Sequence, residues 1–276
     1  MIFKGERFSL LHCGPFVAVH LAVLGIFFVP FHWWYPVLAL GLYAARMFFV
    51  TAGYHRYFSH RTFKTTRFFQ GVLAVTAMTS LQKGVLWWAA HHRHHHRYSD
   101  LDEDVHSPTL RGFWWSHVGW ILSKRYNTTR SELVPDLARY PELRWLNKNH
   151  VVPGALLGTL LFLVGGLGVF FWGFCVSTVL LWHGTFTINS LCHVFGRRRY
   201  QTTDTSRNSL ILSLITMGEG WHNNHHHYMS SVRQGFFWWE IDLTYYILKM
   251  LSWAHIVWDL KMPPRALLEP LPIAAD

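Results

Sequence analysis

Histidine is concentrated in one short stretch of this chain, and its spacing there suits metal binding. Residues 91–96 read His-His-Arg-His-His-His, so five imidazoles occupy six positions. On a helix, His92, His95 and His96 stand at i, i+3 and i+4 and project from one face, where they can converge on one ion. A solvated basic surface segment is the alternative interpretation of this stretch taken alone.

A second run, nearer the C-terminus, repeats the pattern. His222, His225 and His226 again stand at i, i+3 and i+4. If this run is also helical, its three rings share one face in the same way. Two H-x-x-H-H runs in one chain are difficult to attribute to chance.

Three more imidazoles and one amide lie where long apolar blocks end. His55 and His60 follow the first block. Their i, i+5 spacing places them about 140° apart on a regular helix, so we expect one on the last helical turn and the other just beyond it. Asn189 and His193 end the second block and, being four residues apart, share a helical face.

Together these segments supply nine imidazoles, which is more than one ion needs. Two transition-metal ions, each with four or five nitrogen ligands, would use them all. Structural zinc fits poorly because its sites are usually closed, tetrahedral and often thiolate-bound. Copper and nickel also accept imidazole. A site that can bind oxygen at the mouth of a lipid-embedded bundle is placed to oxidise a hydrocarbon chain, which favours iron.

The two apolar blocks must position these histidines. They cover roughly residues 16–50 and 151–192 and are nearly free of charge. Each is about twice the ~20 residues that a helix needs to cross a hydrocarbon core, which predicts two helical hairpins. Paired prolines and aromatics at 30–36 and the Gly-Gly pair at 165–166 are typical of the turns. A buried soluble helical core is the alternative.

The charge distribution gives the expected orientation. Residues 53–150 carry 14 Lys and Arg against 7 Asp and Glu, whereas both turns lack Lys and Arg. This asymmetry places the connecting segment, the histidines and both termini in the cytoplasm. The net charge of +10 indicates attraction to anionic headgroups or acidic partners. No nucleic-acid-binding pattern is visible.

We therefore predict an all-α integral membrane protein made of one domain, residues 1–276. Four transmembrane helices, in hairpins at about 16–52 and 151–195, would carry a cytoplasmic helical cap formed by about 53–150 and 196–276. Residues 68–90 predict a helix lying against the membrane or across the ends of the spans. Arg46, the one formal charge inside either hairpin, should reach an interface or pair with a neighbouring helix.

The histidine segments resemble the boxes of membrane-bound fatty acyl desaturases of the stearoyl-CoA (Δ9) desaturase family. The matching patterns run in order from about residue 42 to 235: H-R-x-x-x-H at 55–60, H-R-x-H-H-x-x-S-D at 92–100, N-S-x-x-H at 189–193 and G-E-G-x-H-N-x-H-H at 218–226. The resemblance implies a mushroom-shaped four-helix bundle with a cytoplasmic cap that holds two non-haem irons.

The resemblance also implies which residues bind the irons. One iron would take His55, His60, His92, His96 and His225. The other would take His95, His193, His222 and His226, with a water held by Asn189. His91, His94 and His227 fall outside the boxes and are expected at the surface or behind the ligands. The acidic residues of 100–104 could orient ligand imidazoles, or they could form a solvated loop.

The implied reaction is the O2-dependent conversion of a saturated acyl chain into a cis mono-unsaturated one. Because the chain offers no polar handle near the reacting carbons, a bent tunnel must select the position. Gln82, Trp88 and Thr185 match family positions that shape this bend, which supports a Δ9 outcome. Tyr43 and Met47 match the region that closes the tunnel end, so Met47 is expected to limit acyl length.

The head-group positions match the family less well. Ala90 and His91 stand where animal acyl-CoA enzymes carry an Arg-Asp pair, and Ser123 replaces another basic residue, although Lys124 keeps a positive charge. An acyl-CoA is the expected substrate because the cap is basic. An acyl chain bound to a phospholipid or a carrier protein remains the alternative.

Electrons should come from a separate protein, because the chain shows no His-Pro-Gly-Gly haem segment and no G-x-G-x-x-G motif. A ferredoxin, a cytochrome b5 or a reductase would serve, and the basic cap suits an acidic donor. The nearest alternative reaction is hydroxylation of a lipid or alkane by the same kind of centre. A membrane metal transporter would need polar residues along the spans, and the hairpins contain almost none.

Overall fold

The computed structural model describes residues 5–269 and is mostly helical. The strands of this part of the chain are two-residue segments, β1 (Lys64–Thr65) and β2 (Val257–Trp258). They pair antiparallel, with Lys64 opposite Trp258 and Thr65 opposite Val257. The prediction of an all-α protein is therefore confirmed, and the small ladder pairs residues that follow the second long helix with residues that follow α13 (Leu243–Trp253).

Three long apolar helices dominate one half of the molecule. By length and composition, the candidate membrane spans are Leu10–Phe28, Trp34–Ser59 and Val152–His193. The first comprises α1 (Leu10–Ala22) and η1 (Val23–Phe28), and the second comprises α2 (Trp34–Phe49) and η2 (Val50–Ser59). The first helix thus begins at Leu10, within the segment that the sequence analysis places before the first span.

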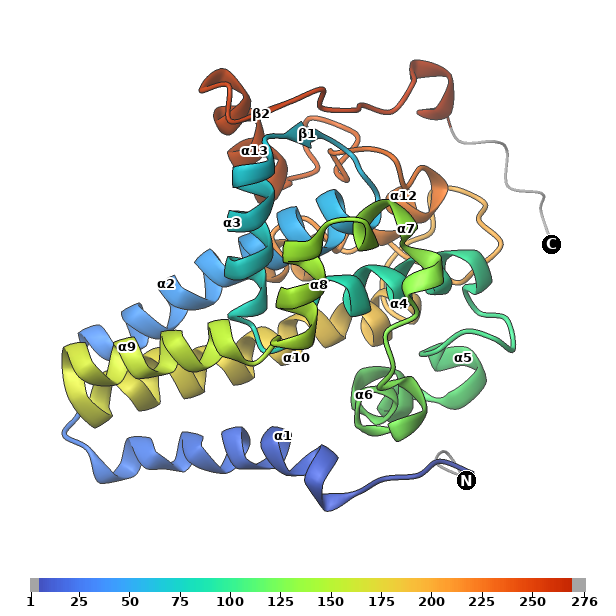
Figure 1. Cartoon of the computed structure of the whole chain (residues 1–276). Helices are drawn as coiled ribbons and strands as arrows, with labels where there is room; N and C mark the ends of the chain where they lie inside the picture. Colours follow the sequence, from blue (N-terminus) through green and yellow to red (C-terminus); the bar gives the residue numbers. More distant parts are fainter. Residues whose placement is uncertain (1–4, 270–276) are drawn as a thin grey trace.

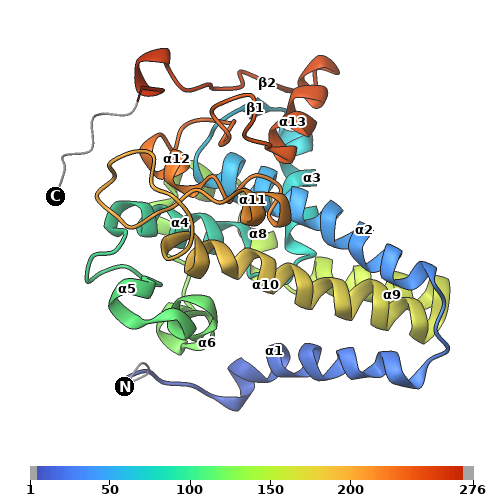
Figure 2. The same cartoon turned by 180° about the vertical axis from the view of Figure 1, so that it is seen from behind.

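The third long helix reverses direction in its middle. It contains α9 (Val152–Val169), η6 (Phe170–Val176), α10 (Ser177–Ser190) and η7 (Leu191–His193). Gly165 and Gly166 leave helical geometry, and Gly166 has a φ of +65°, which favours glycine. Beyond this break, α10 returns beside α9, as Figures 1 and 2 show. The glycine pair is thus the turn that the sequence predicts.

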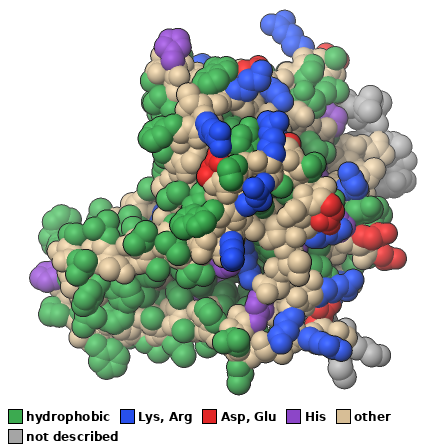
Figure 3. All heavy atoms as spheres, in the orientation of Figure 1, with side chains coloured by type: hydrophobic (Ala, Val, Ile, Leu, Met, Phe, Trp, Pro, Cys, Tyr) green, Lys and Arg blue, Asp and Glu red, His purple; other side chains and the backbone are tan. Residues whose placement is uncertain are grey.

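The remaining elements form a second half around the open ends of the long helices. Figures 1 and 2 show both ends of the described chain on this side, away from the hairpin turns. Hydrophobic side chains cover the α1, α2 and α9 half, while Lys and Arg gather over the other half (Figure 3). The elements of this half, which we call the cap, are α3 (Arg67–Met78), α4 (Val85–Tyr98), α5 (Pro108–Arg111), η3 (Trp115–Gly119), α6 (Trp120–Leu122), η4 (Lys124–Tyr126), η5 (Ser131–Leu133), α7 (Pro135–Ala138), α8 (Pro141–Lys148), α11 (Leu210–Ile215), α12 (His222–His227), α13 (Leu243–Trp253) and η8 (Arg265–Leu267).

The single helix predicted for residues 68–90 is wrong. The structure has two helices there, because the chain breaks after α3 and α4 begins only at Val85. Leu81 and Lys83 adopt positive φ angles of 56° and 67°, which no continuous helix allows. Instead of lying on a membrane surface throughout, α3 buries one face that includes Leu73 and Met78.

Arg46 joins two spans through hydrogen bonds. Its guanidinium group is buried and donates to Ser177 Oγ at 2.8 Å and to Thr178 Oγ1 at 2.9 Å, both on α10. A third bond runs to the carbonyl oxygen of Thr79, at 2.7 Å. Of the two expected roles, the structure therefore shows pairing with a neighbouring helix, which satisfies donors that would otherwise be costly to bury.

The histidine-rich helix α4 is capped by a side chain from α8. Its N-cap residue, Gly84, has no side chain to accept hydrogen bonds. Asn147 Oδ1 accepts them instead from the backbone N–H groups of Leu86 and Trp87, at 3.1 and 2.9 Å. These bonds satisfy donors that the first helical turn leaves free, and they fix where α4 begins.

Asn147→Ala should lower stability because it removes this cap. We expect a cost of about 1 kcal/mol, seen as a lower thermal unfolding midpoint of the purified protein in detergent. Asn149→Ala is the matched control, because in the described part of the chain the Asn149 side-chain amide bonds the Trp145 carbonyl oxygen of its own helix and caps no other helix. Equal midpoints for the two variants would show that the cap contributes nothing.

Candidate metal centre

The end of the second long helix places His55 and His60 together. Here η2 is a π-helix, with hydrogen bonds from i to i+5, so residues five apart come onto one face. His60 is the C-cap residue, and its backbone N–H reaches the His55 carbonyl oxygen at 3.3 Å. The expectation that one ring lies on the last turn and the other just beyond it is confirmed. The 140° separation of a regular helix does not apply.

The two H-x-x-H-H runs are helical, as the spacing predicts. His92, His95 and His96 lie on α4, and the second run forms α12. On α4, however, the rings of one run divide: His92 and His96 enter one group of imidazoles, and His95 enters the other. The helix therefore contributes to two sites at once.

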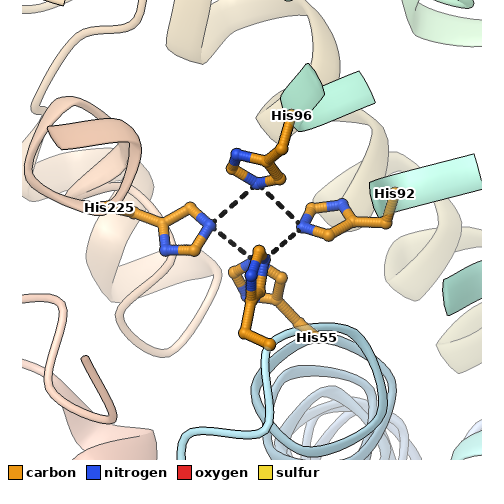
Figure 4. Close-up of side chains that lie close together, drawn as sticks. His55, His92, His96 and His225 are labelled. Carbon is orange, nitrogen blue, oxygen red and sulfur yellow. Dashed lines mark hydrogen bonds between the residues drawn. The ribbon is translucent and has the colours of Figure 1, made fainter. Parts of the chain in front are cut away.

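Five imidazoles form the first group. Their ligand atoms all lie within 4.8 Å of one another. Four Nε2–Nε2 contacts link the rings in sequence: His60 to His92 at 2.8 Å, and then His92 to His96, His96 to His225 and His225 to His55 at 3.0 Å each. Figure 4 shows the rings of His55, His92, His96 and His225 pointing at a common centre.

These contacts are too many to be hydrogen bonds among neutral rings. A neutral imidazole nitrogen either carries one hydrogen or has one lone pair, so it can serve one partner. In a chain of five atoms joined by four contacts, at most two contacts can then be hydrogen bonds. A metal ion resolves the conflict, because imidazole ligands about 2.1 Å from an ion lie about 3.0 Å apart when they meet at a right angle.

His95, His193, His222 and His226 form the second group, again within 4.8 Å of one another. Nε2 atoms of His193 and His222 are 3.2 Å apart. Nε2 atoms of His95 and His226 are buried without any hydrogen-bond partner among the described residues. Buried polar atoms are rarely left unpaired, so this set also fits a metal ion.

Carboxylates hold the outer nitrogens of several rings. The contacts are His95 Nδ1 to Asp104 at 2.9 Å, His226 Nδ1 to Asp204 at 2.6 Å, His193 Nδ1 to Asp100 at 3.4 Å, and His55 Nδ1 to Glu219 at 2.5 Å. A carboxylate on Nδ1 fixes the tautomer that leaves Nε2 free to bind a metal. Of the acidic residues at 100–104, Asp100 and Asp104 therefore orient histidines, while Asp102 is exposed.

Burial keeps most of these rings neutral. It lowers the pKa of five rings well below 6.5, helped by neighbouring imidazoles, and it lowers the pKa of His226 to about 4 despite Asp204. The five are His60, His92, His96, His222 and His225. Burial opposes charge on His95 as well, but the Asp104 carboxylate outweighs it and raises the pKa of that ring. Neutral imidazole is the form that ligates metals.

An apolar cavity reaches the first group of histidines. It has a volume of about 310 Å³ and lies between α1, α4, α6 and α10. Gln82, Trp88, Thr185, His92 and Asn189 all line it. Gln82 Nε2 donates to Thr185 Oγ1 at 3.0 Å, and the indole of Trp88 stacks on His92 with centroids 4.8 Å apart. On this face, Figure 3 shows the surface hollowed between α9 and α1.

The other predicted substrate residues lie outside this lining. Tyr43 and Met47 pack against Gly184, which precedes Thr185; a Cβ there would lie 2.8 Å from the Tyr43 hydroxyl and 2.9 Å from Met47 Cε. They therefore lie behind the cavity wall. Lys124 is exposed and does not line the cavity.

The three histidines outside the boxes make hydrogen bonds to backbone carbonyl oxygens and belong to neither group. His91 and His94 are buried, so they are not surface residues. His91 Nδ1 bonds the Trp87 carbonyl oxygen, and His94 Nε2 bonds the Glu103 carbonyl oxygen. His227 Nε2 bonds the carbonyl oxygen of Leu267.

Some residues of the site were missed by sequence reasoning. Asp204 lies in no recognised motif, and Glu219 belongs to a motif that gives it no role. His106 is buried, lines the cavity and lies 4.1 Å from the His95 ring. The available signal was the position of His106 shortly after the first histidine run, two residues beyond Asp104.

The spans also contain paired histidines that the sequence analysis did not anticipate. His20 Nε2 on α1 is 3.1 Å from His183 Nε2 on α10, and His183 Nδ1 is 3.0 Å from His117 Nε2 on η3. The Phe16 ring stacks on Trp182 beside them. These contacts hold α1 against α10, which also lines the cavity.

Comparisons with known proteins identify a family for this chain. Residues 31–255 match the fatty acid desaturase family. The chain is 36% identical over 237 residues to an acyl-CoA 5-desaturase of Anemone leveillei, which covers 84% of this chain and 74% of the relative. It is 36% identical over 268 residues to Delta-9 acyl-lipid desaturase 1 of Arabidopsis thaliana, with 95% and 87% covered. A chloroplastic palmitoyl-monogalactosyldiacylglycerol delta-7 desaturase of Arabidopsis thaliana is 34% identical over 250 residues, with 89% and 67% covered.

Metal-free protein should lose stability as the pH falls. Six of the nine rings have a folded pKa below the ordinary 6.5, so the unfolded chain binds more protons at mildly acidic pH. Their contribution is complete above about pH 6.5 and shrinks below it, by about 1.4 kcal/mol per pH unit for each ring that stays neutral. The raised pKa of His95 has the opposite effect on stability, but it concerns one ring against six.

We expect the thermal unfolding midpoint of chelator-treated protein to decrease as the pH is lowered from about 7 to about 5. A constant midpoint would contradict burial of neutral rings.

Proposed function

The chain belongs to the fatty acid desaturase family, and from this premise we propose that it introduces a cis double bond into a saturated fatty acyl chain in an O2-dependent reaction. The observation that carries the proposal is the pair of adjacent histidine groups together with an apolar cavity whose lining includes His92 of the first group. The histidines could thus hold redox metals, and the residues that line the cavity could hold a hydrocarbon chain. The proposed position of the bond is Δ9.

Two non-haem iron ions are the proposed cofactor. The donors are all buried or half-buried imidazole nitrogens, without a thiolate, since Cys13, Cys175 and Cys192 are free and belong to neither group. His55, His60, His92, His96 and His225 would hold one iron, and His95, His193, His222 and His226 the other, with a water held by Asn189. When bound, the iron pair supplies the oxygen chemistry that breaks an unactivated C–H bond. The chain's own contribution is to keep the rings neutral, oriented and shielded from bulk water.

The cavity would select the carbon atoms that react. Its wall is apolar apart from a few groups, so an acyl chain gains free energy by entering it. The hydrogen bond from Gln82 to Thr185 joins two walls of the cavity, and Trp88 stacks on His92, which also lines the cavity. Because the cavity walls are fixed near the metal ligands, the place at which the acyl chain stops in the cavity decides which of its carbon atoms lies beside the metals. Proximity and orientation then decide which hydrogens are removed.

Membrane placement follows from the apolar half of the molecule. We propose four spans, because the third long helix breaks at Gly165–Gly166 into two antiparallel arms. The cap, the histidine groups and both termini would face the cytoplasm, as the Lys and Arg distribution indicates. The whole chain would then act as one domain, with cap and spans sharing the cavity.

The acyl chain is proposed to arrive as an acyl-CoA. The cavity lining includes Lys83, His12 and His150, and none of the described residues that line it is an Asp or Glu. An anionic head group would therefore meet cationic or neutral side chains. The alternative, an acyl chain on a membrane lipid, fits the same apolar cavity, and the names of the relatives cover both kinds of substrate. Electrons would come from a separate ferredoxin, cytochrome b5 or reductase that docks on the basic cap.

Expression in a desaturase-deficient host tests the reaction. We expect cis mono-unsaturated acyl chains in gas chromatograms of fatty acid methyl esters, with the double bond located at Δ9. His95→Ala should abolish the product by removing a proposed ligand. The control, His94→Ala, removes a ring that, within residues 5–269, has its hydrogen bond to the Glu103 carbonyl oxygen and belongs to neither histidine group, so this variant should retain activity. If the product is an alcohol, the proposed desaturation is wrong and the reaction is a hydroxylation.

Met47→Ala should shift the products toward longer acyl chains. Met47 is fully buried and packs on Gly184 behind the cavity wall, so its truncation opens space in that direction. Met78→Ala is the matched control, a fully buried methionine on α3. Both should cost about 2–5 kcal/mol of stability, so only a difference in chain-length profile reports on the tunnel. Identical profiles would remove Met47 from the set of length-determining residues.

A further inference from the structure

The two histidine groups differ in the charge that surrounds them. In the four-imidazole group, three of the rings have a carboxylate on Nδ1: His95 has Asp104, His226 has Asp204 and His193 has Asp100. In the five-imidazole group, the only such carboxylate within the described chain belongs to Glu219, on His55. Nδ1 atoms of His96 and His225 are buried and have no hydrogen-bond partner there.

The carboxylates of the four-imidazole group are not neutralised by Lys or Arg. Among residues 5–269, the ion pairs of Asp100, Asp104 and Asp204 are with histidines alone. Their other contacts are hydroxyl and backbone N–H groups, such as Thr205 and Ser107 on Asp100, the backbone of His106 on Asp104 and the backbone of Ser206 on Asp204. Neutral donors hold these carboxylates in place and leave their negative charge available to the ring.

Glu219 is in the opposite situation. Its Oε1 accepts from Arg56 Nε at 3.0 Å and from Arg56 Nη2 at 2.9 Å. Arg56 is fully buried and also pairs with Asp242 at 2.9 Å. Glu219 and Asp242 thus share one guanidinium group, so this network carries one net negative charge, against three on the carboxylates of the four-imidazole group.

We propose that this asymmetry makes the four-imidazole group load first and bind its metal ion more tightly, with Asp100, Asp104 and Asp204 as its positioning residues. The inference rests on the proposed function, because it takes both groups to be metal sites. A carboxylate on the outer nitrogen raises the basicity of the ligating nitrogen and fixes its direction. Three buried negative charges also stabilise a nearby cation strongly where water is excluded.

Titration of metal-free purified protein with Co2+ tests the order of loading. Co2+ reports its ligand field by visible absorption and does not need O2 or a reductant. We expect two classes of site, the first filled completely before the second. His222→Ala should remove the tight class and His60→Ala the weak class, which assigns each class to its group.

Single carboxylate variants test the cause. Asp104→Asn should weaken the tight class about 10- to 100-fold and leave the weak class unchanged, whereas Glu219→Gln should weaken only the weak class. Asp102→Asn, an exposed carboxylate of the same loop, is the matched control and should change neither. Asp204→Asn repeats the test through another ring if Asp104→Asn fails to fold.

The outcomes separate this inference from the proposed function. Binding in two equal classes, or loss of both classes together in Asp104→Asn, would overturn the asymmetry while leaving two metal sites. A purely structural role of Asp104 predicts the second of these results. Absence of any stoichiometric Co2+ binding would instead overturn the metal centre itself.

Discussion

The structure depends on one constraint: nine imidazoles must be held close together in two groups, each ring buried or half-buried. Nitrogen lone pairs about 3 Å apart repel unless a cation lies between them, and they cannot all pair with one another. Bringing them together therefore costs free energy that the rest of the fold must supply. The contributing elements are η2, α4, η7 and α12, which lie far apart in the chain.

Buried polar networks hold these elements in place from behind. Arg56 connects η2 to Glu219 and Asp242, and its Nη1 also donates to the Val232 carbonyl oxygen at 2.7 Å. Asn224 on α12 bonds Asn208 and Glu240. Buried ion pairs contribute little net stability but strongly disfavour arrangements that leave a charge unpaired. This property suits a site whose rings must meet within a few tenths of an ångström.

The apolar half of the molecule meets a different demand. Side chains such as Leu10, Leu11 and Phe28 are almost fully exposed, which is unfavourable in water and favourable in lipid. Polar groups within the spans are paired instead of exposed: Arg46 with α10, and His20 with His183. The same contacts draw α1 and α2 onto α10 and so enclose the cavity. The packing of the candidate spans and the shape of the cavity thus rest on the same helix contacts.

The sequence by itself determined the helical class, the apolar blocks and the local geometry of both H-x-x-H-H runs, because helix periodicity and hydrophobic length are local properties. It also identified the nine histidines that form the two groups. Two features required the tertiary structure. The π-helical turn brings His55 and His60 onto one face, and Asp204 and Glu219 meet rings that other segments supply. These depend on contacts between residues distant in the chain, such as Arg56 and Glu219, which no local pattern of residue types encodes.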